Sequence, residues 1–176
     1  MLKAVDTAVF YFINNTCSNR FFDIVMPWLT QLGEWEVLLS IALLVFLLRK
    51  KEAKVSGIYL SVGLLAAYWT VFFLKIWFAR PRPFVALSGV HLLAHAGRFS
   101  FPSGHATDIF LAATVLSLAL KKPFALYLIA AGVAFSRIYL GVHYPSDTIA
   151  GALIGVALGK GMIWAGNIVR KHVGEV

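Results

Sequence analysis

The stretch FPSGHATDIFLAATVLSLAL, residues 101–120, joins a polar beginning to a long apolar segment. From Ile109 onward its residues are almost all apolar or small, which is typical of a helix buried in a bilayer or a helical bundle. The residues before that point include Ser103, Gly104, His105 and Asp108. Polar and ionisable groups are costly at membrane depth, so their position at the start of an apolar helix indicates a functional site.

The whole chain has the composition of an integral membrane protein. Of its 176 residues, 60% are hydrophobic and only 14% are charged, and its mean hydropathy is +0.79. Apolar runs recur along the full length without a linker or a repeat, so we expect one domain over residues 1–176. The single Cys17 excludes an internal disulfide. The N-terminus lacks the cleavage site of a secretory signal, so we expect it to remain in the mature protein.

Five segments are apolar enough to be membrane-spanning helices. They cover residues 33–48, 56–79, 103–122, 123–141 and 146–168. Two further apolar pieces, 4–13 and 21–32, are each too short to cross about 30 Å of hydrocarbon. We expect them to be interfacial helices or a re-entrant pair rather than a sixth span. The predicted fold is all-α: a polytopic membrane bundle of five or six transmembrane helices with interfacial N-terminal helices.

The connections between the spans differ in charge. Basic residues lie on one side of the five-span arrangement: Arg49, Lys50, Lys51, Lys54, Lys121, Lys122, Arg170 and Lys171. That side is expected to be cytoplasmic, because cytoplasmic loops are enriched in lysine and arginine. The alternation of the spans brings three polar segments, 75–83, 101–105 and 136–147, to the opposite side. A polar site is therefore expected on the outer face.

Each polar residue of these segments has an ordinary structural explanation when it is taken alone. Lysines and arginines at span ends usually extend to the headgroups, a lone histidine forms interfacial hydrogen bonds, and a lone serine caps a helix. None of these explanations accounts for three cations, two histidines, a serine and an aspartate on one face. We therefore interpret the cluster as a site with a chemical function.

Lys75, Arg82 and Arg137 together carry the charge that binds a multiply charged oxyanion, and phosphate is the ligand that suits them. Ser103 and Gly104 lie at the predicted start of a helix. Backbone amides and the positive end of the helix dipole attract phosphate oxygens at that position. We therefore predict that these five residues bind phosphate.

His143 and Asp147 are a candidate nucleophile and its orienting group. They are four residues apart, a spacing that places the carboxylate one helical turn away, against the imidazole. An oriented imidazole can attack phosphorus, and the departing alkoxide then needs a proton. His105 is predicted to supply that proton as the general acid.

At these residues the sequence resembles the type 2 phosphatidic acid phosphatases. Three signature motifs of that family occur in order: Lys-x6-Arg-Pro at 75–83, Pro-Ser-Gly-His at 102–105, and Ser-Arg-x5-His-x3-Asp at 136–147. The resemblance implies a phosphohistidine on His143, oriented by Asp147, with His105 as acid in the first step and activator of water in the second. It also implies a phosphate pocket, without a metal cofactor, made of Lys75, Arg82, Ser103, Gly104 and Arg137.

The substrate implied by the resemblance is a lipid phosphate of a bacterial inner membrane, cleaved on the periplasmic or exterior side. Lipid A 1-phosphate, undecaprenyl pyrophosphate and phosphatidylglycerophosphate all fit the motifs. Four cations near the loop that caps the site either select a bulky polyanionic headgroup or attract anionic lipids in general: Arg80, His91, His95 and Arg98. Asp108 either supports His105 or a pocket cation, or belongs to a structural ion pair.

Two other functions use the same residues. A lipid phosphotransferase would form the same intermediate, whereas a non-enzymatic phospholipid binder or transporter would need only the cations. Binding requires neither a nucleophile nor its orienting carboxylate, so the pair of His143 and Asp147 favours an enzyme. The expected partners are the bilayer and a membrane lipid phosphate, and nothing in the sequence indicates nucleic acid or an obligate protein partner.

Overall fold

The computed structural model describes residues 2–172, apart from the side chains of residues 2, 170 and 171, so the basic side chains of Arg170 and Lys171 lie outside the described part. The elements are α1 (Leu2–Tyr11), η1 (Phe12–Thr16), α2 (Arg20–Leu29), η2 (Thr30–Gly33), α3 (Trp35–Leu47), α4 (Lys51–Phe78), α5 (Pro83–Ala86), α6 (Gly104–Leu120), α7 (Pro123–Tyr139) and α8 (Pro145–His172). Within the described range, β-type pairing is limited to one isolated bridge between Pro81 and Phe99. The all-α prediction is therefore confirmed.

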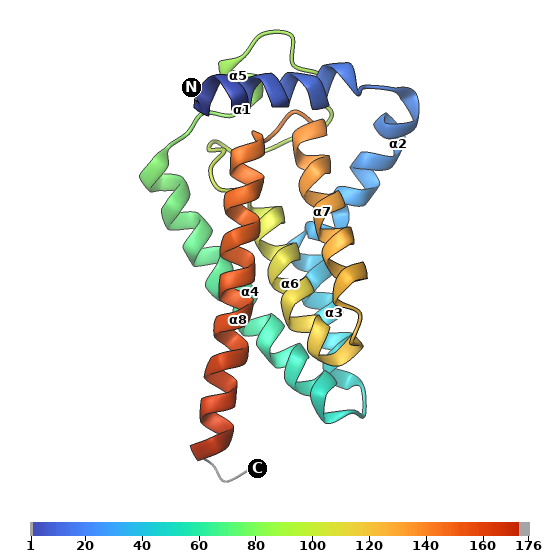
Figure 1. Ribbon diagram of the computed structural model, residues 1–176, viewed down its shortest axis with the longest axis vertical. Helices are drawn as coiled ribbons and strands as arrows, with labels where there is room; N and C mark the ends of the chain where they lie inside the picture. Colours follow the sequence, from blue (N-terminus) through green and yellow to red (C-terminus); the bar gives the residue numbers. More distant parts are fainter. Residues whose placement is uncertain (1, 173–176) are drawn as a thin grey trace.

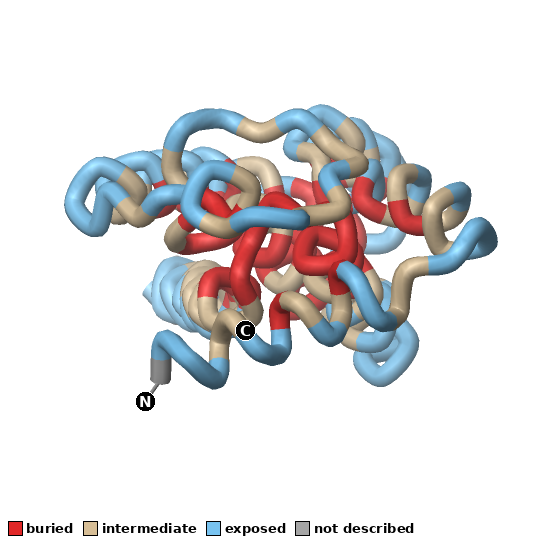
Figure 2. The backbone as a smooth tube through the Cα atoms, turned by 90° about the horizontal axis from the view of Figure 1, so that it is seen from above, coloured by how far each residue is buried: buried red, intermediate tan, exposed pale blue. Residues whose placement is uncertain are grey.

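The long helices run side by side along one axis, and α1 lies across one end of the bundle (Figure 1). The central helix is α6, which contacts α3, α4, α7 and α8. Seen from the end, the buried backbone gathers in the middle and exposed backbone surrounds it (Figure 2). One cluster of buried apolar side chains joins α3, α4, α6 and α7, and it includes Leu38, Leu60, Leu111, Val115 and Val133.

A row of glycines brings α8 very close to α6. Gly151, Gly155 and Gly159 recur every four residues and therefore share one face of α8. A Cβ atom added at Gly155 would collide with the main-chain oxygen of Thr107, and one added at Gly159 would lie 2.7 Å from the Cβ of Thr114. Small residues at this spacing let membrane helices pack backbone to backbone. The two helices are thus held together by main-chain contact.

Two helices, α4 and α8, are long and apolar enough to cross a membrane by themselves, and the pair α2 with η2 and α3 qualifies as a third span that is bent by 56°. The remaining apolar helices, α6 and α7, have 17 residues each. This length is at the lower limit for a transmembrane helix. Large apolar side chains such as Trp69, Leu153 and Trp164 are exposed on the outside of the bundle, as expected for contact with lipid.

The N-terminal region differs in part from the expectation. The position of α1 across the end of the bundle fits an interfacial helix (Figure 1). The second apolar piece, however, forms α2 and continues through η2 into α3, so residues 20–47 form one bent column, which is either a broken span or a re-entrant segment. The break falls at Gly33, where a Cβ atom would lie only 2.8 Å from the side chain of Val133. Close packing against α7 thus explains why this column bends.

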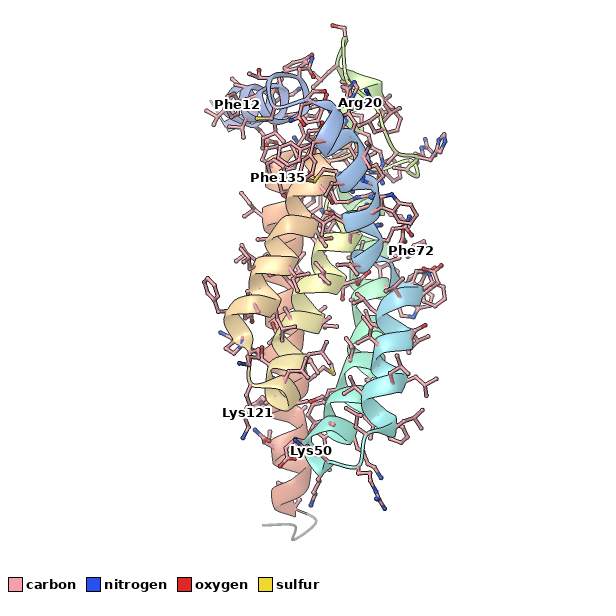
Figure 3. All side chains as sticks on the ribbon, turned by 90° about the vertical axis from the view of Figure 1, so that its right-hand side faces the viewer. Phe12, Arg20, Lys50, Phe72, Lys121 and Phe135 are labelled. Carbon is pink, nitrogen blue, oxygen red and sulfur yellow. The ribbon has the colours of Figure 1, made fainter. Side chains whose placement is uncertain are left out.

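The two ends of the bundle have different characters. Figure 3 shows Lys50 and Lys121 at one end, while Phe12 and Arg20 lie at the other. The helix connections at the first end are exposed and basic. The second end carries α1, α5, the long connection to α6 and the turn between α7 and α8 (Figure 1). All three motifs end here, as the alternation of spans predicted.

Candidate active site

His143 lies in the short connection between α7 and α8 and is 2% exposed. The connection turns at Gly141, whose φ of +81° is in the left-handed region that favours glycine. Asp147 follows in the first turn of α8 and is completely buried. The Nδ1 atom of His143 lies 3.5 Å from Oδ2 of Asp147. The structure therefore brings together the two residues that were predicted as nucleophile and orienting group.

A hydroxyl connects these two side chains. Ser100 donates a short hydrogen bond from Oγ to Oδ2 of Asp147, and the same Oγ lies 3.5 Å from Nδ1 of His143. The amide of Tyr144 also donates to Oδ2, at 2.8 Å. These hydrogen bonds fix the position of the Asp147 carboxylate. Ser100 also links this carboxylate to the imidazole of His143, in addition to the direct contact between the two side chains. Ser100 was not among the predicted site residues.

Arg82 faces the other nitrogen of the same ring, with its Nη1 atom 3.2 Å from Nε2 of His143. A guanidinium can only donate, so Nε2 accepts and the ring proton resides on Nδ1, toward Ser100 and Asp147. Arg82 is held in place by the main-chain oxygens of Gly97 and Val142. Burial lowers the pKa of Arg82 to about 10, so it remains charged at neutral pH. The lone pair on Nε2 therefore points at a fixed cation.

Burial, together with nearby positive charge, keeps the imidazole of His143 neutral. Burial is the largest cause that lowers the pKa of His143 well below its usual value of 6.5. Nearby positive groups lower it further, in this order of effect: Arg82, Arg137, Lys75 and His105. A neutral imidazole has a free lone pair and is the nucleophilic form. The predicted phosphate-binding cations thus lie close enough to His143 to act on it.

Arg137 and Lys75 are held differently. Arg137 donates from Nη1 to Oγ1 of Thr30 at 2.8 Å, while its buried Nε atom has no hydrogen-bond partner in the described chain. Lys75 donates from Nζ to the main-chain oxygen of Phe99 at 3.0 Å, just before the second motif. A buried donor without an acceptor is costly, so the Nε atom of Arg137 is suited to an oxygen that a ligand supplies.

The start of α6 supplies fewer free amides than expected. Ser103 caps the helix by accepting from the amide of Ala106, at 3.4 Å. Its own amide donates to the main-chain oxygen of Asp147 at 3.0 Å, so this amide is not free for a phosphate oxygen. The hydroxyl hydrogen of Ser103 and the amide of Gly104 remain the candidate donors at this helix terminus.

His105, the predicted general acid, is paired with Glu34. Its Nε2 atom lies 3.1 Å from Oε1 of Glu34, at the break between η2 and α3. A Cβ atom added at Gly33 would lie 3.2 Å from the Cβ of His105, so the glycine permits this close approach. Glu34 was not predicted as a site residue. An acidic residue at the start of an apolar segment was the available signal, but alone it also suits a solvated span end.

Of the four cations assigned to the capping loop, Arg80 and His91 have structural partners. Arg80 donates from Nη1 to Asp147 at 2.7 Å and from Nη2 to Asp6 at 2.6 Å. His91 lies 3.2 Å from the carboxylate of Asp23. These two are therefore tied to the protein, which argues against a role for them as free headgroup selectors. His95 and Arg98 remain exposed, and the guanidinium of Arg98 lies over the ring of Phe99.

A cavity of about 700 Å³ opens beside these residues, between α3, α4 and α6. Its wall is mostly apolar and aromatic, and its polar members are Ser61, Lys75, Gly104 and Asp108. Asp108 forms neither a hydrogen bond nor an ion pair with the side chains that the structure describes, so it does not belong to a structural ion pair among them. The cavity thus brings two of the residues predicted to bind phosphate, Lys75 and Gly104, into one apolar chamber with the carboxylate of Asp108.

Comparison with known proteins agrees with this geometry. The model of the family described as PAP2 superfamily matches residues 56–170. The chain is 32% identical over 177 residues to YbjG of Escherichia coli (strain K12), provisionally named an undecaprenyl-diphosphatase, covering 93% of this chain and 85% of that protein. It is 34% identical over 136 residues to a lipid A 4'-phosphatase of Porphyromonas gingivalis, covering 70% of this chain and 57% of that protein.

The crystal structure of Aquifex aeolicus LpxE has the same fold, with a TM-score of 0.81 and 34% identity over 90% of this chain and 94% of that one. The family match covers all three motifs, including His143 and Asp147. The chain therefore belongs to the PAP2 superfamily, and it is a phosphatase of that superfamily.

Proposed function

We propose that this chain hydrolyses a lipid phosphate through a phosphohistidine formed on His143. The observation that carries the proposal is the position of a nucleophilic nitrogen beside one guanidinium, together with a second guanidinium that has a buried donor without an acceptor. Nε2 of His143 presents its lone pair beside Arg82 at 3.2 Å, and the buried Nε atom of Arg137 has no acceptor in the described chain. Phosphate oxygens would accept from both guanidinium groups and bring phosphorus to Nε2.

In the first step, Nε2 of His143 attacks phosphorus as the bond from phosphorus to the lipid oxygen breaks. The proton on Nδ1 stays with the imidazole, and Ser100 and Asp147 stabilise the positive charge that develops there. His105 donates a proton to the departing lipid oxygen. Lys75, Arg82 and Arg137 stabilise the charge on the transferring phosphoryl group.

In the second step, a water molecule attacks the phosphorus of the phosphohistidine. His105, now neutral, accepts a proton from that water, and the bond from phosphorus to Nε2 breaks. Inorganic phosphate leaves, and both histidines return to their starting states. Glu34 pairs with His105 at 3.1 Å and stabilises the protonated form that the first step needs. The cycle balances without a metal ion, because the three cations supply the charge.

The proposed substrate is a membrane lipid that carries a phosphate, taken from the bilayer in which the chain is embedded. The apolar cavity that reaches Lys75 and Gly104 suits a lipid whose phosphate enters the site. Relatives named undecaprenyl-diphosphatase and lipid A 4'-phosphatase act, by their names, on compounds of this class. The proposed location is the bacterial inner membrane, with the basic end in the cytoplasm and the site facing the periplasm.

Trapping the intermediate tests the reaction. Purified protein in detergent, with a chelator present, is mixed with a lipid labelled in its phosphate and quenched in base, where a phosphohistidine survives. We expect label on the wild-type protein and on His172→Gln, whose histidine lies at the exposed end of α8. His143→Gln should carry none. Phosphate release without labelled protein would overturn the intermediate, and label passing to an added alcohol faster than to water would indicate a phosphotransferase.

Labelling from the two sides tests the orientation. A cysteine placed at exposed Lys122, in a variant whose Cys17 is replaced by serine, should react only with reagents that reach the cytoplasm. A cysteine at exposed His95 should react with an impermeant reagent added outside intact cells. The reverse pattern would place the site in the cytoplasm and leave the proposed chemistry unaffected.

A further inference from the structure

The cavity between α3, α4 and α6 contains one group that the proposed reaction does not use. Asp108 lies on the same face of α6 as Gly104, one turn further along the helix, or about 6 Å along its axis. Both residues line the cavity. A lipid whose phosphate lies at Gly104 and Lys75 therefore has its next chemical group beside the Asp108 carboxylate.

The carboxylate of Asp108 lacks a partner within the protein. It forms no hydrogen bond or ion pair with the described residues, and the charged group that acts on it is Glu34, which is also a carboxylate. Lys75 lines the same cavity, but its Nζ atom donates to the main-chain oxygens of Phe99 and Ser100, at 3.0 and 3.4 Å. Most of the surrounding wall is apolar, including Trp35, Leu64 and Val71.

An unpaired carboxylate in an apolar chamber favours some ligands over others. A hydroxyl or amide N–H donates to it and relieves the cost of its burial. A hydrocarbon chain leaves the carboxylate without water and without a donor, and a second phosphate brings like charge close to it. The site therefore distinguishes lipids by the group that follows the scissile phosphate.

We infer that Asp108 selects lipid phosphates that carry a hydroxyl or amide N–H donor within about one helical turn of the phosphate. Sugar and glycerol phosphate lipids have such donors, whereas a polyprenyl diphosphate has a second phosphate at that place. This inference rests on the proposed function, because it assumes that the phosphate binds at Lys75 and Gly104. It narrows the substrate to a class that the motifs leave open.

The test compares two lipids on the same variants. The measured quantity is kcat/KM for an amino-sugar phosphate lipid, lipid A, divided by kcat/KM for undecaprenyl diphosphate. We expect Asp108→Leu to lower this ratio roughly 10-fold to 100-fold, because the donor of the sugar lipid loses its acceptor and the diphosphate loses a repulsive charge. Asp108→Asn should lower the ratio less, since its amide oxygen still accepts, and it covers the case in which the leucine variant fails to fold.

The matched control is Glu36→Gln, which removes an exposed carboxylate at the start of α3 that does not line the cavity. Its ratio should equal that of the wild type. An unchanged ratio in both Asp108 variants, or a ratio that rises, would overturn the inference. Absence of a phosphoenzyme from the wild type with either lipid would instead overturn the proposed function, so the two failures are distinguishable.

Discussion

Arg80 holds Asp147 in place by a hydrogen bond of 2.7 Å from Nη1 to Oδ1. The other side of the same guanidinium binds Asp6 of α1 at 2.6 Å, and its Cζ atom lies 3.9 Å from the ring centre of Tyr144. Asp6 also accepts from the amide and the hydroxyl of Ser146, at the beginning of α8. The helix that lies across the end of the bundle is therefore connected through Arg80 to the carboxylate behind the nucleophile.

Loss of Arg80 is predicted to slow the chemical step rather than substrate binding. Arg80→Gln frees one oxygen of Asp147, so the imidazole is less well oriented, and kcat should fall roughly 10-fold to 100-fold with KM changed little. Arg80→Lys keeps the positive charge but cannot bind Asp147 and Asp6 with two separate nitrogens, so its kcat should lie between those of the wild type and Arg80→Gln. Steady-state kinetics on a lipid phosphate make the measurement, and a rise in KM with kcat intact would assign Arg80 to substrate binding instead.

The pH dependence of phosphoenzyme formation should report the neutral form of His143. Because burial and neighbouring cations lower the pKa of His143, the imidazole stays unprotonated as the pH falls through its usual value of 6.5. The acid limb of kcat/KM is therefore expected below pH 6.5, since activity is lost only when the folded-state pKa is reached. Rapid-quench rates over a range of pH provide the measurement. An acid limb above that value would contradict the neutral, cation-surrounded imidazole.

The role of His105 can be separated from that of His143 by the leaving group. An acid matters most when the departing oxygen is basic, so His105→Ala should slow phosphoenzyme formation strongly with an alkyl phosphate and much less with an aryl phosphate. His143→Ala should fail with both. Glu34→Gln should follow the pattern of His105→Ala more weakly, because it removes only the partner at 3.1 Å. Equal losses with both substrates in single-turnover experiments would reduce His105 to a phosphate ligand.

Two glycines of α8 make a matched pair for the packing of the bundle. A Cβ atom at Gly155 would meet the main chain of α6, whereas nothing lies within 4 Å of the corresponding position at Gly161. Gly155→Ala should destabilise the protein by about 1 to 3 kcal/mol through overpacking, and Gly161→Ala should not. Thermal unfolding in detergent compares the two. Similar unfolding temperatures for both variants would mean that α8 can move away from α6 at little cost.

The sequence allowed the main features to be predicted because they depend on local pattern. Apolar runs located the helices, and the alternation of spans placed Lys75, His105 and His143 at one end of the bundle. The pairing of Arg80 with Asp6 could not be predicted, because 74 residues separate them and α1 had no assigned position over the site. The bend between α2 and α3 depends on how Gly33 packs against Val133, which no local pattern records.

The glycine contacts also divide the helix pairs into those that meet through the main chain and those that meet through a side chain. At Gly155, the main chain of α8 packs directly against the main chain of α6. The main chains of α4 and α3 are similarly close at Gly57, where a Cβ atom would lie 2.6 Å from the main-chain oxygen of Ala42. Between these two pairs, a Cβ atom added at Gly63 of α4 would come closest to side-chain atoms of Leu111 in α6. Beside the cavity, α4 and α6 therefore meet at Gly63 through a side chain that can change its rotamer, and not through two rigid main chains.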